Sequence, residues 1–455
     1  MDSYGIISLV PVVVVIVTAI ISKRALESLL LGTFVATIII AQGDWFNLWM
    51  DVTFTEFGDS AYYILMFGLF GALIKILEFS GAAMGFSDIG AKIANTRKKT
   101  LILTWILGLI IFVEDYLNAL GVGIAMQKLT DRFKVSRQYL AFIVNSTGAA
   151  VCILVPFSSW GVLYAAQIES VGVITDMSGF AAYARAIPYM LYAWAAVVVV
   201  PLFCLGIIPL FGPMKKAEER ALLYGEVFPE DYYKEGEESE ELIASTKEIK
   251  TSSALNFIIP MLILIGVTIY TEDILLGVIF ALITCFVLLF PQKLITLGKF
   301  CDYTVEGFKD MLYVTGLVLV AFVLQNFNDM LGLTPYVIES VTPILSPALF
   351  PAVVFLVVGA IAFSTGSFWG VAAISFPIIL PLAVALEVNI FMAIGVVAAA
   401  TAFGSHTCFY SDAVTVTCAS TGIKNMDYSK TALPLISIPF VIGMIGYLIM
   451  GFIMA

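Results

Sequence analysis

The stretch that most constrains how this chain can fold is residues 101–129, where polar side chains stand in the middle of an apolar segment. Glu114, Asp115 and Asn118 lie at its centre. Charged groups inside a membrane are costly and usually functional, so these three residues are our first candidates for binding ions or protons. The alternative is a structural pair of carboxylates neutralised by Lys75, the only basic residue within an apolar run.

Basic residues flank this stretch on both sides, at 92–99 and at 128–137. Because basic loops mark the cytoplasmic side of a membrane, we expect the chain to leave on the side where it entered. Glu114 then lies on the order of 20 Å from the first basic loop, deep in a hydrocarbon core roughly 30 Å thick. We therefore predict a re-entrant hairpin over 100–127, whose charged tip lines a cavity inside the protein.

The composition is that of a multi-pass membrane protein. Of the 455 residues, 60% are hydrophobic and 13% are charged, and the mean hydropathy is +1.00. The net charge of -11 owes much to one polar stretch, because eleven acids fall between 218 and 248, and it predicts no nucleic-acid partner. We expect an all-α fold in a lipid bilayer, in the inner membrane of a prokaryotic cell.

Apolar runs divide the chain into two similar halves. Each half offers three spans, a hairpin, a broken span and a final span, which gives about ten transmembrane helices and two re-entrant hairpins. The predicted parts are a first repeat over 1–212 with hairpin 100–127 and broken helix 138–166, a cytoplasmic linker over 213–252, and a second repeat over 253–455 with hairpin 347–386 and broken helix 390–422.

The distribution of basic residues predicts the orientation. This layout places 21 of the 23 Lys and Arg residues on the cytoplasmic side and leaves out Lys75 and Arg185. The N- and C-termini are then outside, the first hairpin opens inward and the hairpin over 347–386 opens outward. The two halves are therefore inverted repeats, and inverted repeats with interrupted helices are the architecture of secondary transporters.

The first broken span carries polar clusters at 145–148 and 156–161. Proline and glycine interrupt a helix there, which leaves carbonyl oxygens to coordinate a cation. Asn145 is a candidate ion ligand. Hydroxyl groups in membrane helices also bond their own backbone, and this interpretation stays open for each of them. The candidate substrate contacts are Ser146, Thr147, Ser158 and Ser159.

The tip of the second hairpin, at 364–370, is polar but uncharged. We expect its exposed helix N-termini and its side chains to contact substrate rather than exchange protons. The candidates are Thr365, Ser367 and Trp369, although Trp369 could equally serve packing.

The penultimate span carries the last polar cluster, with Ser405 as a candidate substrate contact. His406 is the only histidine, and it either titrates near physiological pH or is held structurally. Asp412, six residues later, is a candidate ion or proton ligand for the same reason as Asp115. A bound Na⁺ is predicted at Asp115, Asn145 and Asp412.

At these stretches the sequence resembles the NhaC-type Na⁺/H⁺ antiporter family, a branch of the ion transporter superfamily. The resemblance is carried by 114–118 with 128–131, by 151–154 with 158–160, and by 403–412. It implies a scaffold and a mobile transport domain with two hairpins, an elevator-like movement and a homodimer. It also implies Na⁺/H⁺ antiport, with Na⁺ as the transported or coupling ion and no other cofactor.

The sequence departs from the family pattern at Glu114, which stands in place of an Asp, and at Phe409-Tyr410, which stand in place of Pro-Ile. Two carboxylates of the pattern are missing, since Asn145 and Ser405 stand where family members often carry Asp. The alternative is therefore Na⁺- or H⁺-coupled transport of an amino acid or small organic acid on the same fold. An enzyme is not expected, because the chain has no HExxH motif and one histidine cannot supply a multi-His metal site. A channel is disfavoured because two opposed hairpins are typical of alternating access.

Overall fold

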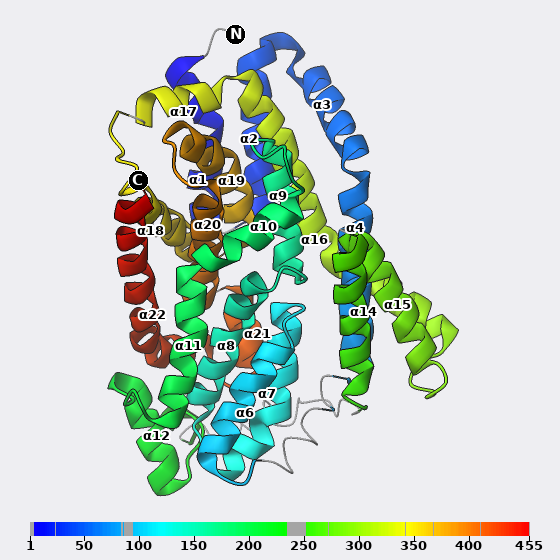
Figure 1. Ribbon diagram of the computed structural model, residues 1–455, viewed down its shortest axis with the longest axis vertical. Coiled ribbons are helices and arrows are strands. Elements are labelled where there is room, and N and C mark those ends of the chain that lie inside the picture. The colour runs from blue at the N-terminus through cyan, green and yellow to red at the C-terminus, as the bar shows by residue number, and fades with distance from the viewer. Residues whose placement is uncertain are drawn as a thin grey trace.

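The computed structural model describes residues 4–22, 24–82, 85, 94–233, 252–271, 273–341, 343–366, 368–409 and 411–454, and these form helices without any β-strand. Figure 1 shows an elongated molecule with both termini in its upper half. Helix α12 (Gly212–Tyr224) lies at the lower end. Four short 3₁₀ helices complete the described elements: η1 (Gly5–Leu9), η2 (Gln42–Asp44), η3 (Ile187–Tyr189) and η4 (Glu230–Tyr233).

The helices pack in two groups, which we call the first and the second bundle. In the first bundle, α16 packs against α2 and α4, α15 packs against α4, and α14 packs against α15. The second bundle contains both hairpins and both broken spans. The first bundle is α1 (Val10–Ser22), α2 (Ala25–Ala41), α3 (Trp45–Asp59), α4 (Ala61–Phe79), α14 (Leu255–Thr271), α15 (Ile274–Leu289) and α16 (Leu297–Met330). The second is α6 (Arg97–Ile110), α7 (Asp115–Arg132), α8 (Arg137–Leu154), α9 (Ser159–Val171), α10 (Gly179–Ala186), α11 (Leu191–Leu205), α18 (Phe350–Thr365), α19 (Phe368–Ala385), α20 (Ile390–Thr407), α21 (Asp412–Thr421) and α22 (Asn425–Met454).

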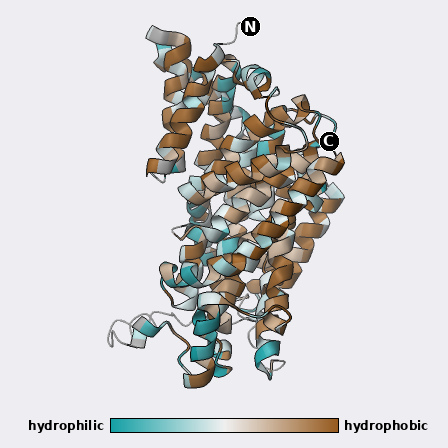
Figure 2. Cartoon of the chain, turned by 90° about the vertical axis from the view of Figure 1, so that its left-hand side faces the viewer, coloured by the Kyte–Doolittle hydropathy of each residue, from teal (hydrophilic) through white to brown (hydrophobic). Residues whose placement is uncertain are grey.

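The helices confirm a multi-pass membrane protein. Among the described residues, five helices are long and apolar enough to cross a membrane, or up to seven if each of two bent pairs is one span. Five further apolar helices are 10–17 residues long. Figure 2 shows hydrophobic helices through the body of the molecule and hydrophilic segments gathered toward its lower end.

Each stretch predicted as a hairpin contains two consecutive helices, and re-entry into the membrane stays a prediction. The first consists of α6 and α7, which flank a non-helical tip at 111–114, and the second consists of α18 and α19. Figure 1 shows the first pair in the lower half of the molecule and the second pair in the upper half. The two hairpins thus approach the centre from opposite ends, as inverted repeats would require.

The two stretches predicted as broken helices each contain two consecutive helices, α8 with α9 and α20 with α21, and they share one local contact. Helices α8 and α9 meet at a bend of 40°. Ser158 caps α9 and donates to the carbonyl of Cys152 at 2.5 Å, six residues earlier. Ser411 caps α21 and donates to the carbonyl of Ser405 at 2.8 Å, again six residues earlier. This repeated contact fits an internal duplication, while the repeat boundaries and their inversion stay predictions.

Three stretches differ from the sequence-based expectation. Residues 43–59 separate two apolar runs, which predicts a loop, but they include helix α3. In α3, Trp49 stacks on Phe34 at 4.9 Å and donates to Thr33 at 2.9 Å. The linker begins with α12, which is anchored because Glu218 pairs with Arg97 and accepts from the Ser136 amide. Residues 334–346 also separate two apolar runs, which predicts a loop, but helix α17 (Leu333–Val341) occupies part of them. Side-chain contacts with other helices stabilise the first two, and the polarity of the sequence alone does not reveal those contacts.

The first bundle owes its close packing to glycine. At Gly71 of α4 and Gly307 of α16, an added Cβ would collide with the backbone of the facing helix. Only residues without a side chain let two helix backbones approach so closely. This contact fixes α16 beside α4, and α16 in turn presents its other side to α19 and α9 of the second bundle.

Candidate functional site

The tip of the first hairpin buries two adjacent carboxylates at the start of a helix. Glu114 caps α7 by accepting from the Leu117 amide at 2.7 Å, and Asp115 is the first residue of that helix. The side chain of Asn118 donates to the carbonyls of Gly108 and Ile111, at 2.7 and 2.8 Å, and so closes the end of α6. Unpaired helix amides and the helix dipole favour negative charge at this position.

Trp160 connects this tip with the second hairpin. Its indole N–H donates to Oδ1 of Asp115 at 3.1 Å, and its ring stacks on Phe368 with centroids 3.9 Å apart. Trp369 lies 5.5 Å from the same ring. The Ser159 amide donates to the Val113 carbonyl at 2.9 Å, which fixes the start of α9 against the first tip. The N-termini of α7, α9 and α19 therefore meet at Trp160.

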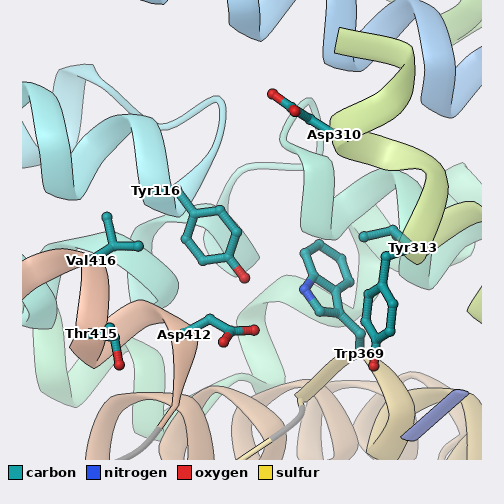
Figure 3. Close-up of a pocket in the computed structure, with 8 residues that line it drawn as sticks. Tyr116, Asp310, Tyr313, Trp369, Asp412, Thr415 and Val416 are labelled. Carbon is teal, nitrogen blue, oxygen red and sulfur yellow. The ribbon is translucent and has the colours of Figure 1, made fainter. Parts of the chain in front are cut away.

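A cavity of about 340 Å³ lies beside this junction, between the two bundles. Figure 3 shows the Tyr116 hydroxyl pointing toward the Asp412 carboxylate, with Trp369 and Tyr313 on the facing wall. Asp412 is the first residue of α21, so a fourth helix N-terminus joins the group. The residues that line the cavity are Tyr116, Asp310, Tyr313, Val314, Trp369, Asp412, Thr415 and Val416.

His406 and Asn145 belong to a separate buried network. The two ring nitrogens of His406 lie 3.0 Å from the Ser146 hydroxyl and 2.7 Å from the Tyr192 hydroxyl. Asn145 donates to the His406 carbonyl at 3.1 Å and to the Tyr428 hydroxyl at 2.6 Å. Since a hydroxyl donates or accepts, a neutral imidazole is satisfied here in either tautomer. The hydrogen bonds of Asn145 lead to this network rather than to Asp115 or Asp412.

Several predicted substrate contacts bond their own backbone. The hydroxyl of Thr147 donates to the Ile143 carbonyl at 3.0 Å, and that of Thr365 donates to the Ile361 carbonyl at 2.9 Å. Ser158 is occupied as the cap of α9. Of the predicted substrate contacts, Trp369 lines the cavity, whereas Ser367 lies outside the described residues.

Four buried oxygens near the helix breaks have no hydrogen-bond partner among the described residues: Asp115 Oδ2, Asn118 Oδ1, Ser159 Oγ and Ser405 Oγ. Three of them belong to the first hairpin tip and the start of α9, which the Ser159 amide joins. Such groups are costly to bury unless something satisfies them. Within the described part of the chain, however, no three His, Cys, Asp or Glu side chains are grouped to hold a metal ion.

The alternative interpretation, in which Lys75 neutralises the carboxylates of the hairpin tip, is wrong. Its ammonium lies 2.8 Å from Asp310 and 3.4 Å from Glu78. The close contact of α4 with α16 brings Lys75 to Asp310, a residue far away in sequence. As a result, no Lys or Arg of the described chain forms an ion pair with Glu114, Asp115 or Asp412.

Two further cavities lie between the bundles, and the smaller of them lies against the C-terminal end of α16. One of about 450 Å³ is lined by Asp59, Tyr63 and Glu169, among others, and one of about 260 Å³ by Asp59, Tyr63 and Asp329, among others. Asp329 stands nineteen residues beyond Asp310 on α16, on the order of 30 Å further along the helix. The aromatic junction at Trp160 lies between the first cavity, which Trp369 lines, and the larger of the other two, which Val162 lines.

Sequence reasoning did not single out Trp160, Tyr116, Tyr313 or Asp310 as site residues. Trp160 follows Ser159 and Tyr116 follows Asp115, so their place next to predicted site residues was the signal that could have identified them. Tyr313 and Asp310 lie on α16, and only the packing of the two bundles brings them to the hairpin tips. The one signal for Asp310 was Lys75, because a buried cation requires an acidic partner.

This fold, with paired hairpins and broken helices meeting at polar cavities, defines a multi-pass membrane protein built like a secondary transporter. Residues 151–452 match the Na⁺/H⁺ antiporter family. The chain belongs to that family of transporters, which confirms the resemblance seen in the sequence.

Two similar proteins extend the comparison. An uncharacterised protein of Haemophilus influenzae is 27% identical over 498 residues, covering 98% of this chain and 91% of that protein. The solved structure of Neisseria gonorrhoeae MtrF, described with a class of antimetabolite efflux pumps, superimposes with a TM-score of 0.54 at 14% identity. That match covers 91% of this chain and 86% of MtrF, and it supports the fold alone.

Proposed function

We propose that the chain is a secondary active transporter that exchanges Na⁺ for H⁺ by alternating access. The observation that carries this proposal is the Glu114–Asp115 pair, which is 3% and 2% exposed and has no basic partner among the described residues. Two adjacent buried carboxylates cannot both stay ionised without a compensating cation. Either a proton or a sodium ion can supply that positive charge.

Competition for the pair provides the exchange. Asp115 Oδ2 has no donor among the described residues, and the neighbouring Glu114 carboxyl can donate to it only when the pair holds a proton. Na⁺ prefers oxygen ligands, and the unpartnered oxygens of Asn118 and Ser159 lie at the same junction. We propose Asp115 as the group for which Na⁺ and H⁺ compete, with Asp412 as the carboxylate that faces the cavity.

The packing supports a scaffold and a transport domain. The first bundle would serve as the scaffold, and the second, with both hairpins, as the moving domain. Cavities beside the middle and beside the C-terminal end of α16 offer two positions at the domain boundary, as an elevator-like movement would need. The same proposal includes a homodimer in the inner membrane, with the termini outside and the polar linker in the cytoplasm.

The test uses purified protein in liposomes that enclose a pH-sensitive dye. An imposed Na⁺ gradient, with no organic solute present, should move protons in the opposite direction. Asp115→Asn should abolish this movement, whereas Asp302→Asn, which removes an exposed charge from α16, should leave it unchanged. Proton movement at the wild-type rate in Asp115→Asn would refute the assignment.

A second candidate function is ion-coupled transport of a small organic solute, and the cavity favours it. Small-molecule sites occupy about 300–1,000 Å³, and the 340 Å³ beside Asp412 lies in that range. Here the sodium ion or proton would prepare the site, and Trp369 would contact the solute. If Na⁺ moves protons only after a solute is added, this second function replaces simple exchange.

A further inference from the structure

The cavity between Tyr116 and Tyr313 has properties that the exchange of Na⁺ for H⁺ does not require. Its 340 Å³ exceeds the roughly 30 Å³ of one water molecule about tenfold. A partly dehydrated sodium ion needs oxygen ligands in direct contact, whereas much of this wall is aromatic. The space therefore fits a small organic molecule.

The charge of the cavity selects the sign of its ligand. Asp310 and Asp412 line it, and no Lys or Arg does. Asp310 is neutralised by Lys75 at 2.8 Å, whereas no basic residue of the described chain pairs with Asp412. The cavity thus keeps one uncompensated negative charge, which attracts a cation and repels an anionic solute.

Its aromatic side chains point to an organic cation. Tyr116, Tyr313 and Trp369 border the space around Asp412 (Figure 3). Aromatic faces attract ammonium groups within about 6 Å of the ring centre, and Trp does so most strongly. The Trp369 ring is held in place because it packs against Phe368 at 4.5 Å and Trp160 at 5.5 Å.

We propose that this cavity binds the ammonium group of a small organic cation, with Asp412 as the counter-ion and Trp369, Tyr313 and Tyr116 as the aromatic wall. The proposal rests on the transport function above, because the organic cation would be the transported solute. Tyr116 follows Asp115 directly and reaches toward Asp412, so it joins the cation site to the pair that binds the coupling ion.

Calorimetry on the full-length protein in detergent tests this proposal with four matched probes. Tetramethylammonium and butylammonium should bind, whereas butanol and butyrate should not. Asp412→Asn should weaken binding of both cations about tenfold or more, and Asp412→Glu should restore most of it. Trp369→Leu should weaken binding between about threefold and thirtyfold.

Two variants control for general damage: Asp302→Asn removes an exposed charge from α16, and Trp194→Phe alters a tryptophan that is 44% exposed. Both should bind the cations like the wild type. Equal affinity for butanol and butylammonium, or unchanged binding in Asp412→Asn, would overturn the inference. The liposome assay without amines separates the outcomes. If Na⁺ drives proton movement but the amines do not bind, this inference is refuted and the Na⁺/H⁺ antiport proposal stands. If the amines bind but Na⁺ drives no proton movement, this inference is supported and the Na⁺/H⁺ antiport proposal is refuted.

Discussion

Replacing Trp160 with Phe tests the proposed exchange chemistry with a single removed hydrogen bond. The indole N–H donates to Asp115 at 3.1 Å, while the ring stacks on Phe368 at 3.9 Å with 8° between the planes. Phenylalanine keeps an aromatic ring in this stack but removes the donor. The change therefore acts mainly on how well the site stabilises an ionised Asp115.

The magnitude follows from the charge of the acceptor. A hydrogen bond to a charged group contributes about 1.5–3 kcal/mol. Because this bond stabilises the ionised form, its loss favours the protonated form. At about 1.4 kcal/mol per pH unit, the pH of half-maximal exchange should rise by between about 1 and 2 units. At a fixed pH below that midpoint, the Na⁺ concentration for half-maximal exchange should rise correspondingly.

The assay is Na⁺-driven proton movement in liposomes, measured over a pH series for the wild type and the variant. Trp105→Phe is the matched control, because Trp105 donates an indole hydrogen bond of 3.0 Å to the backbone carbonyl of Val197, in another part of the bundle. An unshifted midpoint in a folded Trp160→Phe protein would show that Trp160 does not stabilise the ionised carboxylate. A shift of equal size in Trp105→Phe would show that the effect is not local.

Three further predictions concern single positions. In Glu114→Gln, one carboxylate of the pair is lost, so the rate of exchange should depend less steeply on pH. An unchanged steepness of the pH profile would contradict a proton shared by Glu114 and Asp115. His406→Phe should lower the stability measured by thermal unfolding by about 1–3 kcal/mol, because it leaves hydroxyl groups unpaired. The pH profile of exchange should not change, and a shifted profile would identify His406 as a proton carrier. Gly108→Val should lower the midpoint of thermal unfolding, because the new side chain would collide with Thr147. Gly43→Ala should leave that midpoint unchanged, because the new Cβ meets open space. Equal stability of the two variants would contradict the close contact of α6 with α8.

The local features of the second bundle were predictable because local chemistry decides them. Proline, glycine and capping residues interrupt helices wherever they occur in an apolar run, so the breaks near Ser158 and Ser411 could be placed from sequence. The hairpin over 100–127 followed from polar residues between two basic loops. The structure places its turn at 111–114.

The partners of individual side chains were less predictable. In the sequence, a structural hydroxyl such as that of Thr147, or a structural histidine, looks the same as one that binds a ligand. Only the hydrogen bonds in the folded protein distinguish a structural residue from a ligand-binding one. The ion site predicted at Asp115, Asn145 and Asp412 remains a prediction, and the observed bonds of Asn145 lead instead to His406 and Tyr428.

The sequence by itself determined that this is a multi-pass helical membrane protein of the Na⁺/H⁺ antiporter family, with carboxylates at interrupted helices. Those properties depend on composition and on neighbours within a few residues. Only the tertiary structure decided that Lys75 neutralises Asp310, that Trp160 joins both hairpin tips, and that Tyr313 faces Asp412 across a cavity. These contacts join segments far apart in the chain. The two that involve α16 depend on the glycines that let it pack closely on α4 and so place it opposite the hairpins.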